Sequence, residues 1–233
     1  MAERYPQTRF TPPAGSTLVT LVRHGQSQAG DPENPFPLVD GHGDPPLTDL
    51  GHAQAAAVGE RLRHEQFDAV YASSLTRTHQ TAAPLVDHQG HDLRIEPDLR
   101  EIFLGDWEGG LMRKMTAEGT HPAVAEFRRT GDWGAIPGAE SNAEFTTRCT
   151  DALRRIVGEH GESSLALFVH GGVIGALLGA ATRGTMMSFA GADNGSIHRL
   201  VVTDHRWFLR SFNDIGHLDG VETPLAGGDT VSP

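Results

Sequence analysis

The chain is short of the residues that mark disulfide-stapled or membrane-spanning proteins. It has one cysteine among 233 residues, Cys149, and one cysteine can form neither an internal disulfide nor a zinc cluster. Cys149 falls in a helical pattern, so its expected role is packing. No window approaches the ~18 apolar residues of a membrane span, and the N-terminus has no apolar stretch suited to a signal peptide. We therefore expect a soluble cytoplasmic protein with no membrane partner.

Runs of Lys or Arg are also absent, and the formal net charge is −11. Nucleic-acid binders usually carry a basic face, so no DNA or RNA partner is expected. An anionic small substrate is still allowed, because a few local cations can dominate one pocket. The 38% of hydrophobic residues suffice for a substantial core. The sequence predicts a single domain with its core at about 16–215 and with loose termini.

Strand-like and helix-like patterns alternate, which predicts an α/β fold of three layers, with a mostly parallel sheet flanked by helices. The expected strands cover 17–22, 67–73, 93–97 and 164–169, followed by a hairpin of 196–204 and 206–213. The expected helices cover 48–63, 75–88, 142–160 and 172–182. Pro84 should disturb the second helix, and Ser141 with Glu144 has the pattern of a capping box before the third.

Two segments interrupt this alternation. Residues 30–46 contain five prolines and three glycines and are predicted to be loop. They line a pocket entrance or form an ordinary surface loop. Residues 104–140 carry Gly, Pro and Trp around one helical stretch near 122–130. This segment is a small excursion from the core, either a cap over the pocket that includes Trp133 or a structural subdomain.

Two apolar strands finish in similar ways. The strand 17–22 runs into Arg23-His24-Gly25, and the strand 164–169 runs into His170-Gly171-Gly172. Ligands of open parallel sheets bind beyond the carboxyl ends of the strands. If these strands are neighbours, both imidazoles project into one crevice.

The residue types at this crevice suit a phosphoryl group. Glycines let backbone N–H groups approach a ligand, a helix start attracts anions, and Arg23 offers planar donors that match phosphate. Arg77 follows a third strand and should lie near the same edge. Two histidines without acidic partners make a poor metal site, and no HExxH or Cys/His/Asp cluster occurs. We expect neither a metal nor another cofactor.

The same groups could carry out phosphoryl transfer. A neutral histidine can attack phosphorus and split the transfer into two steps. A positioned carboxylic acid can then protonate the leaving group. Glu101, Asp106 and Glu108 follow a short predicted strand and are the candidates.

Five stretches in order, LVRHGQS, DPPLTDLGHAQA, SSLTRTHQTA, LREIFLGDWEG and VHGGVIGALL, together resemble the histidine phosphatase superfamily, also called phosphoglycerate mutase-like. They span about residues 20 to 180. The resemblance implies that His24 is the nucleophile and forms a phosphohistidine. It also implies that Glu101 donates a proton to the leaving oxygen and later activates water, with no metal required.

The resemblance assigns the phosphate contacts as well. Arg23, Arg77 and His170 would hold the phosphoryl oxygens and stabilise the transition state. The backbone N–H of Gly171 and the hydroxyl of Ser27 would join them. Two positions depart from the family pattern, because Gly30 stands where many members carry Asn and Gln26 where Glu is common. One phosphate donor is therefore missing or is supplied from elsewhere.

The sequence thus predicts a metal-independent phosphomonoester hydrolase that acts on a small phosphorylated substrate. A cofactor-dependent phosphoglycerate mutase would use the same core residues, although such mutases usually carry a longer insertion before the second histidine. A non-catalytic phospholigand-binding protein is the alternative from another class. The physiological substrate is left open by the pattern, and a homodimer through an exposed strand edge is a further alternative.

Overall fold

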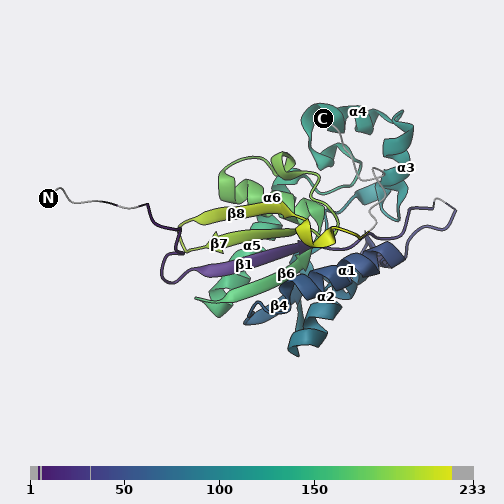
Figure 1. Cartoon of the computed structure of the whole chain (residues 1–233). Helices are drawn as coiled ribbons and strands as arrows, with labels where there is room; N and C mark the ends of the chain where they lie inside the picture. The colour runs from purple at the N-terminus through teal and green to yellow at the C-terminus, as the bar shows by residue number, and fades with distance from the viewer. Residues whose placement is uncertain (1–4, 6, 32, 222–233) are drawn as a thin grey trace.

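The structure, a computed structural model, describes residues 5, 7–31 and 33–221 (Figure 1). Its larger sheet has six strands in the order β5-β4-β6-β1-β7-β8. The strands are β1 (Thr17–Arg23), β4 (Ala69–Ala72), β5 (Leu93–Ile95), β6 (Ser164–Val169), β7 (Ile197–Val202) and β8 (Trp207–Asp214). The pairs β1–β6, β6–β4 and β4–β5 are parallel, whereas β7 is antiparallel to β1 and to β8. The predicted α/β class and the C-terminal hairpin are confirmed, in a mixed sheet.

Two pairs of helices cover the two faces of this sheet (Figure 1). They are α1 (Asp49–Leu62) and α2 (Thr76–Gln89) on one face, and α5 (Asn142–His160) and α6 (Gly171–Thr182) on the other. Successive strand residues point to opposite faces, so Leu21 packs in the core with α5 and α6, while Val22 packs with α1 and α2. This double burial explains why most residues of β1 and β6 are apolar.

The helix ends largely follow the predicted signals. The side chain of Ser141 accepts a hydrogen bond from Glu144 N, and Glu144 accepts one from Ser141 N, so the capping box is formed. The expected disturbance at Pro84 is wrong, since α2 runs continuously from Thr76 to Gln89. The ring of Pro84 instead packs so closely on α1 that a Cβ at Gly59 would overlap it. Cys149 is fully buried in α5.

The two interrupting segments hold more regular structure than predicted. Residues 30–46 include the short antiparallel pair β2 (Leu38–Val39) and β3 (His42–Gly43). Residues 104–140 contain α3 (Leu111–Glu118) as well as α4 (Pro122–Thr130). The helix α3 was missed because it is short and lies between two glycines with positive φ, Gly110 and Gly119. Trp133 packs on Phe127 at 4.4 Å between ring centroids; a cap over the pocket stays a prediction.

Short 3-10 helices complete the fold at η1 (Pro97–Leu99), η2 (Gly105–Trp107), η3 (Trp133–Ala135), η4 (Met186–Phe189) and η5 (Gly216–Leu218). The predicted looseness of the termini concerns, in large part, residues 1–4, 6 and 222–233, which lie outside the described residues. In the described part, no helix combines the length and apolar character needed to cross a bilayer.

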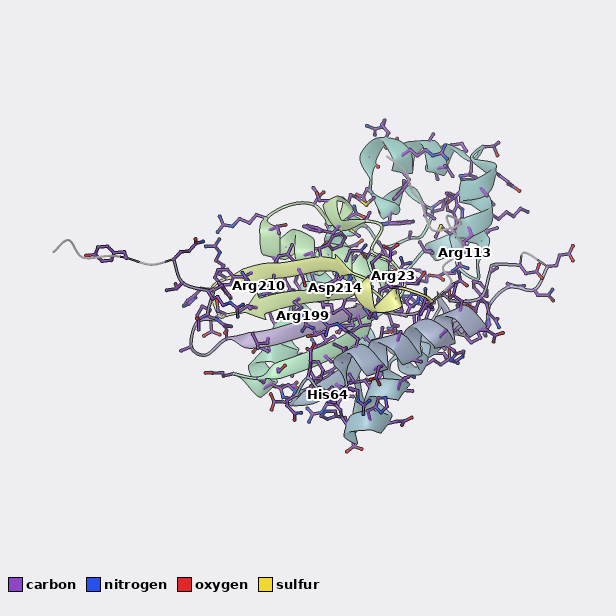
Figure 2. The ribbon with its side chains drawn as sticks, viewed as in Figure 1. Arg23, His64, Arg113, Arg199, Arg210 and Asp214 are labelled. Atoms are coloured by element: carbon purple, nitrogen blue, oxygen red, sulfur yellow. The ribbon has the colours of Figure 1, made fainter. Side chains whose placement is uncertain are left out.

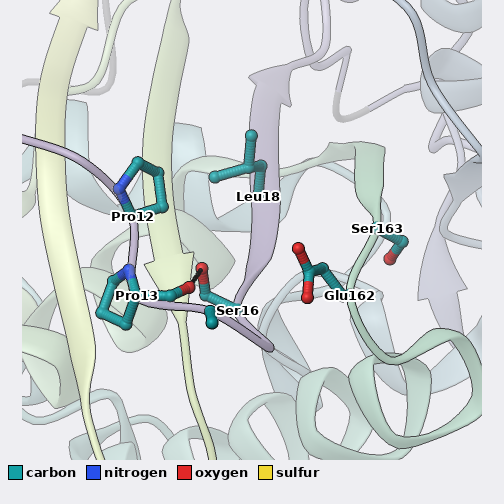
Figure 3. A pocket seen from close by; sticks show the side chains of 7 residues that line it. Pro12, Pro13, Ser16, Leu18, Glu162 and Ser163 are labelled. Atoms are coloured by element: carbon teal, nitrogen blue, oxygen red, sulfur yellow. Dashed lines mark hydrogen bonds between the residues drawn. The ribbon is translucent and has the colours of Figure 1, made fainter.

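One hollow lies at the amino end of β1, the end opposite His24 (Figure 3). It is lined by Pro12, Pro13, Ala14, Ser16, Leu18, Glu162 and Ser163. No Lys, Arg or His side chain is among them, and the carboxylate of Glu162 accepts a hydrogen bond from Gly15 N at 2.8 Å. The hollow therefore lacks the cations that a phosphate site requires.

The start of α1 packs backbone to backbone on the segment after β1, and this contact can be tested. A Cβ on Gly51 would overlap the carbonyl oxygen of Gln26, so Gly51→Ala should lower the free energy of unfolding by about 1–3 kcal/mol. The matched control is Gly158→Ala in α5, where a Cβ would meet nothing within 4 Å. That variant should gain about 0.5–1 kcal/mol from helix propensity. Urea unfolding of both variants gives the comparison, and equal shifts would contradict the packing explanation.

Candidate active site

The pairing of β1 with β6 brings His24 and His170 together. Arg23 lies opposite Val169 in the parallel register. His24 follows Arg23 and His170 follows Val169, so the two histidines leave the sheet side by side. The amide of His24 donates to Val169 O at 3.0 Å. The two imidazole centroids are 5.1 Å apart at an interplanar angle of 62°. The prediction that these strands are neighbours, with both rings at one edge, is confirmed.

The ring of His24 is held in one tautomer. Its Nδ1 lies 2.7 Å from Gly25 O, and a carbonyl oxygen can only accept, so Nδ1 carries the proton of the neutral ring. The lone pair is then on Nε2. Burial, followed by the charges of Arg77 and Arg23, holds the pKa of His24 well below its usual value. At neutral pH the residue is an unprotonated imidazole with a nucleophilic Nε2.

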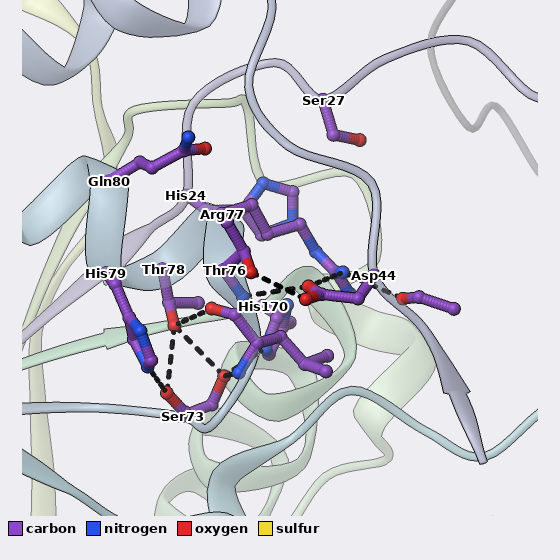
Figure 4. A network of polar contacts seen from close by, with 12 residues as sticks. His24, Ser27, Asp44, Ser73, Thr76, Arg77, Thr78, His79, Gln80 and His170 are labelled. Carbon is purple, nitrogen blue, oxygen red and sulfur yellow. Dashed lines mark hydrogen bonds and ion pairs between the residues drawn. The ribbon is translucent and has the colours of Figure 1, made fainter. Parts of the chain in front are cut away.

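Arg77 is fixed by the segment 30–46 (Figure 4). The amide and hydroxyl of Thr76, the first residue of α2, donate to the carboxylate of Asp44 at 2.8 and 2.6 Å. The guanidinium of Arg77 donates to Gly43 O at 3.0 Å and lies 3.8 Å from the Asp44 carboxylate. Burial lowers the pKa of Arg77 to about 10, so it stays charged at neutral pH. This segment therefore belongs to the site rather than to an ordinary surface loop.

His170 is oriented by a buried serine. Its Nε2 lies 2.8 Å from Ser73 Oγ, at the end of β4 (Figure 4). Its Nδ1 is buried without a hydrogen-bond partner in the described part of the chain. Burial, and next the charge of Arg77, places the pKa of His170 well below the usual value. The ring is neutral, with Nδ1 left over for a ligand.

Arg23 and Gly171 complete the same edge. The guanidinium of Arg23 donates to Ala192 O from the loop before β7. A Cβ on Gly171 would lie 3.4 Å from Arg23 Nε, so the two residues are in direct proximity. Gly171 is the first residue of α6, where backbone N–H groups have no partner within the helix. The helix start and the arginine thus offer donors on one side of His24.

Glu101 reaches this edge from the segment after η1. Its carboxylate accepts from Ile102 N at 3.0 Å and from Gly172 N at 3.1 Å. Burial raises the pKa of Glu101, although both amides and the charges of Arg77 and Arg23 oppose the shift. Of the three acidic candidates, this is the carboxyl at the histidines. Asp106 is exposed, and Glu108 accepts from Gly43 N at 2.7 Å.

The glycines of the two motifs serve packing more than ligand access. The N–H of Gly25 donates to Thr81 Oγ1 at 3.0 Å, and a Cβ there would overlap Gly51 O. A Cβ on Gly172 would overlap the Glu101 carboxylate. The interpretation that Gly25 and Gly172 free their amides for a ligand is therefore wrong. Their lack of a side chain lets α1 and Glu101 approach.

The structure brings the seven predicted site residues to one end of the sheet, and it adds others. Ser27 is buried, and its Oγ accepts from Arg113 Nη2 at 3.1 Å. Arg113 was not predicted, because α3 itself was not predicted. Ser73 and Asp44 lie inside the quoted stretches, but their partners are set by tertiary contacts. No group of three or more His, Cys, Asp or Glu residues within the described ranges is arranged to hold a metal ion.

Comparison with known proteins agrees with this geometry. The family model of the histidine phosphatase superfamily (branch 1) matches residues 19–215. A metal-independent phosphoserine phosphatase from Arabidopsis thaliana is 33% identical over 209 residues, covering 88% of this chain and 84% of that protein. Phosphoglycerate mutase-like protein 4 from the same plant is 31% identical over 219 residues, covering 92% and 93%.

A solved structure extends the likeness to three dimensions. The native mycobacterial glucosyl-3-phosphoglycerate phosphatase superposes with a TM-score of 0.71 at 26% identity, covering 85% of this chain and 99% of that one. Sequence match, fold and the paired histidines at the strand ends thus lead to one assignment. The chain belongs to the histidine phosphatase superfamily.

Proposed function

We propose that the chain hydrolyses phosphomonoesters through a phosphohistidine on His24. The observation that carries the proposal is the locked tautomer of His24, with Nδ1 donating to Gly25 O at 2.7 Å and Nε2 left as a nucleophile. Arg23 and Arg77 supply positive charge beside this nitrogen. A phosphatase is the activity that the two phosphatases among the named relatives support.

In the first step, Nε2 of His24 forms a bond to phosphorus as the ester P–O bond breaks. The two arginines stabilise the charge on the phosphoryl oxygens. His170 takes part with Ser73 Oγ as the donor to its Nε2: the proton of the ring is then on Nδ1, which donates to a phosphoryl oxygen. Protonated Glu101 gives its proton to the leaving oxygen, so the product is a neutral alcohol.

In the second step, water replaces the enzyme on phosphorus. Glu101, now a carboxylate, takes a proton from the attacking water. The new P–O bond forms as the P–N bond breaks, and inorganic phosphate leaves. His24 is returned neutral and Glu101 protonated, so the cycle closes without another reactant.

The expected substrate is a small phosphorylated metabolite. The relatives include a phosphoserine phosphatase and a glucosyl-3-phosphoglycerate phosphatase, and both printed names describe phosphate esters on small molecules. The mutase-like relative keeps a mutase as the second candidate. An assay of 3-phosphoglycerate with a bisphosphoglycerate primer separates the two, since a mutase yields an isomer and a phosphatase yields free phosphate. Self-association stays a prediction.

Replacement of His24 tests the nucleophile directly. His24→Ala should reduce phosphate release from an aryl phosphate, assayed with EDTA, by at least about 10³-fold, because the intermediate loses its acceptor nitrogen. The matched control is His64→Ala, which should retain full activity, because His64 is exposed just after the end of α1 (Figure 2). Rapid quenching should trap phosphate on wild-type protein in an acid-labile form. Full turnover by His24→Ala would overturn the assignment.

Replacement of Glu101 tests the general acid. Glu101→Gln should slow hydrolysis of an alkyl phosphate by about 10²–10⁴-fold, because an alkoxide is a poor leaving group. An aryl phosphate should lose much less, since a phenolate leaves without protonation. Equal losses on both substrates would instead indicate a binding role for Glu101.

The pH dependence follows from the two shifted groups. His24 must be unprotonated, and its pKa is lowered; Glu101 must begin protonated, and its pKa is raised. The value of kcat/KM should therefore rise through the His24 pKa, reach an optimum at acidic to neutral pH, and fall as Glu101 ionises. Glu101→Gln should remove the alkaline fall. A profile flat from pH 4 to 9 with chemistry rate-limiting would contradict both assignments.

A further inference from the structure

Arg113 is a third arginine at the catalytic end of the sheet, and it comes from the 104–140 segment. Figure 2 shows it where α3 faces the end of the sheet that carries Arg23. Its Nη1 donates to Gln28 O at 2.7 Å and its Nη2 to Ser27 Oγ at 3.1 Å. The guanidinium also lies over the ring of Phe36, 5.6 Å from the centroid. These contacts fix its position beside the segment that follows His24.

Close backbone packing brings α3 to this position. A Cβ on Gly30 would lie 2.9 Å from Gly110 O and 3.4 Å from Gly110 Cα. Gly110 has φ 99°, a conformation that favours glycine, and it precedes the first turn of α3. A side chain at position 30 would push α3 away. The small residue there is therefore what allows an arginine from α3 to approach Ser27.

Arg113 carries a charge that no described carboxylate neutralises in an ion pair, although the side chain is half-buried. Its contacts with Gln28 and Ser27 use two of the five guanidinium N–H groups, and the other three have no partner among the described residues. The charge also acts on His24 and Arg77, lowering the pKa of both. An anion bound at this position would offset the repulsion between Arg113 and Arg77.

The contact with Ser27 sets the direction of the serine hydroxyl. Arginine only donates, so its N–H occupies a lone pair of Oγ and cannot receive the hydroxyl proton. That proton is free to point elsewhere. Next to a bound phosphoryl group it would donate to an oxygen of that group.

We propose that Arg113 binds the phosphoryl group as a third arginine and holds the Ser27 hydroxyl in a donating orientation. The inference rests on the proposed function, because it assumes that the phosphoryl group lies at His24. Arg113 then replaces a donor that the glycine at position 30 cannot supply. The 104–140 segment contributes directly to catalysis through this residue.

Orthovanadate binding, measured by calorimetry, tests the inference without turnover. Arg113→Ala should weaken binding by about 10- to 100-fold, the range for losing hydrogen bonds to a charged group. Lys114→Ala is the matched control, since Lys114 is exposed on the same helix and lies 3.8 Å from Glu118; its affinity should be that of wild type. Thermal unfolding of each variant shows whether α3 stays folded. If Arg113→Ala is unfolded, Arg113→Lys takes its place.

The pH dependence of kcat/KM separates a role of Arg113 in the site from a purely structural role. In Arg113→Ala, the acid limb of kcat/KM should shift to higher pH, because His24 loses one neighbouring positive charge. Arg113→Lys keeps that charge and should leave the limb near its wild-type position, with a smaller loss of vanadate affinity. The double variant Arg113→Ala/Ser27→Ala should lose less than the sum of the single losses, since Ser27 acts through Arg113.

Two results would overturn the inference, and they are distinct. A folded Arg113→Ala with wild-type vanadate affinity and an unchanged pH profile removes Arg113 from the site while leaving the proposed function intact. A wild-type protein that neither binds vanadate nor releases phosphate from any ester removes the proposed function, and this inference with it.

Discussion

The parallel pairing of β1 with β6 is the constraint on which the site depends. With Arg23 opposite Val169, both histidines leave the sheet at the same level. A slip of one residue would exchange the faces of every β1 side chain, moving Leu21 out of one core cluster and Val22 out of the other. The hydrophobic contacts on both faces therefore hold the two imidazole rings in place. The same packing stabilises the fold and the geometry of the candidate site.

Burial at this edge of the sheet sets the protonation states of the two histidines and of Glu101. Burial disfavours the charged form of every group; it lowers the pKa of both histidines and raises that of Glu101. The arginines add to the effect on the histidines and oppose it on the carboxyl. The outcome is a neutral imidazole at His24, a carboxyl with a raised pKa at Glu101 and a charged guanidinium at Arg77. Local polar contacts, such as Gly25 O on His24 Nδ1, then select which nitrogen is free.

Much of the fold follows from local sequence rules. Features that depend on neighbours in the chain can be predicted from the sequence. They include the apolar runs of β1 and β6, the capping box at Ser141 and the hairpin of β7 and β8. The helix α3 is eight residues long with glycines at both ends, so its pattern is too short to read. Pro84 shows the converse, since tertiary packing against α1 keeps the helix intact where the local rule favours a break.

The residues of the candidate site also differ in whether the sequence alone predicts them. His24, Arg23, Arg77, His170 and Glu101 lie in short motifs whose order along the chain is itself a signal. The contacts that support these residues do not lie in such motifs. Ser73 and His170 are 97 positions apart in the sequence, and Arg113 and Ser27 are 86 positions apart. Such pairs are chosen by the fold, so only coordinates reveal them. The glycines illustrate the difference, since their positions were visible in the sequence but their reason, space for Gly51 and Glu101, was not.

The place of β1 in the sheet has a consequence for synthesis of the chain. The strand β1 lies between β6 and β7, which are both synthesised long after it. At about 5–20 residues per second, β1 waits on the order of ten seconds or more for either neighbour. During that time an apolar strand with both edges unpaired is exposed to other nascent chains. Growth at low temperature, or with more chaperone, should therefore affect the yield of folded protein more than its final stability.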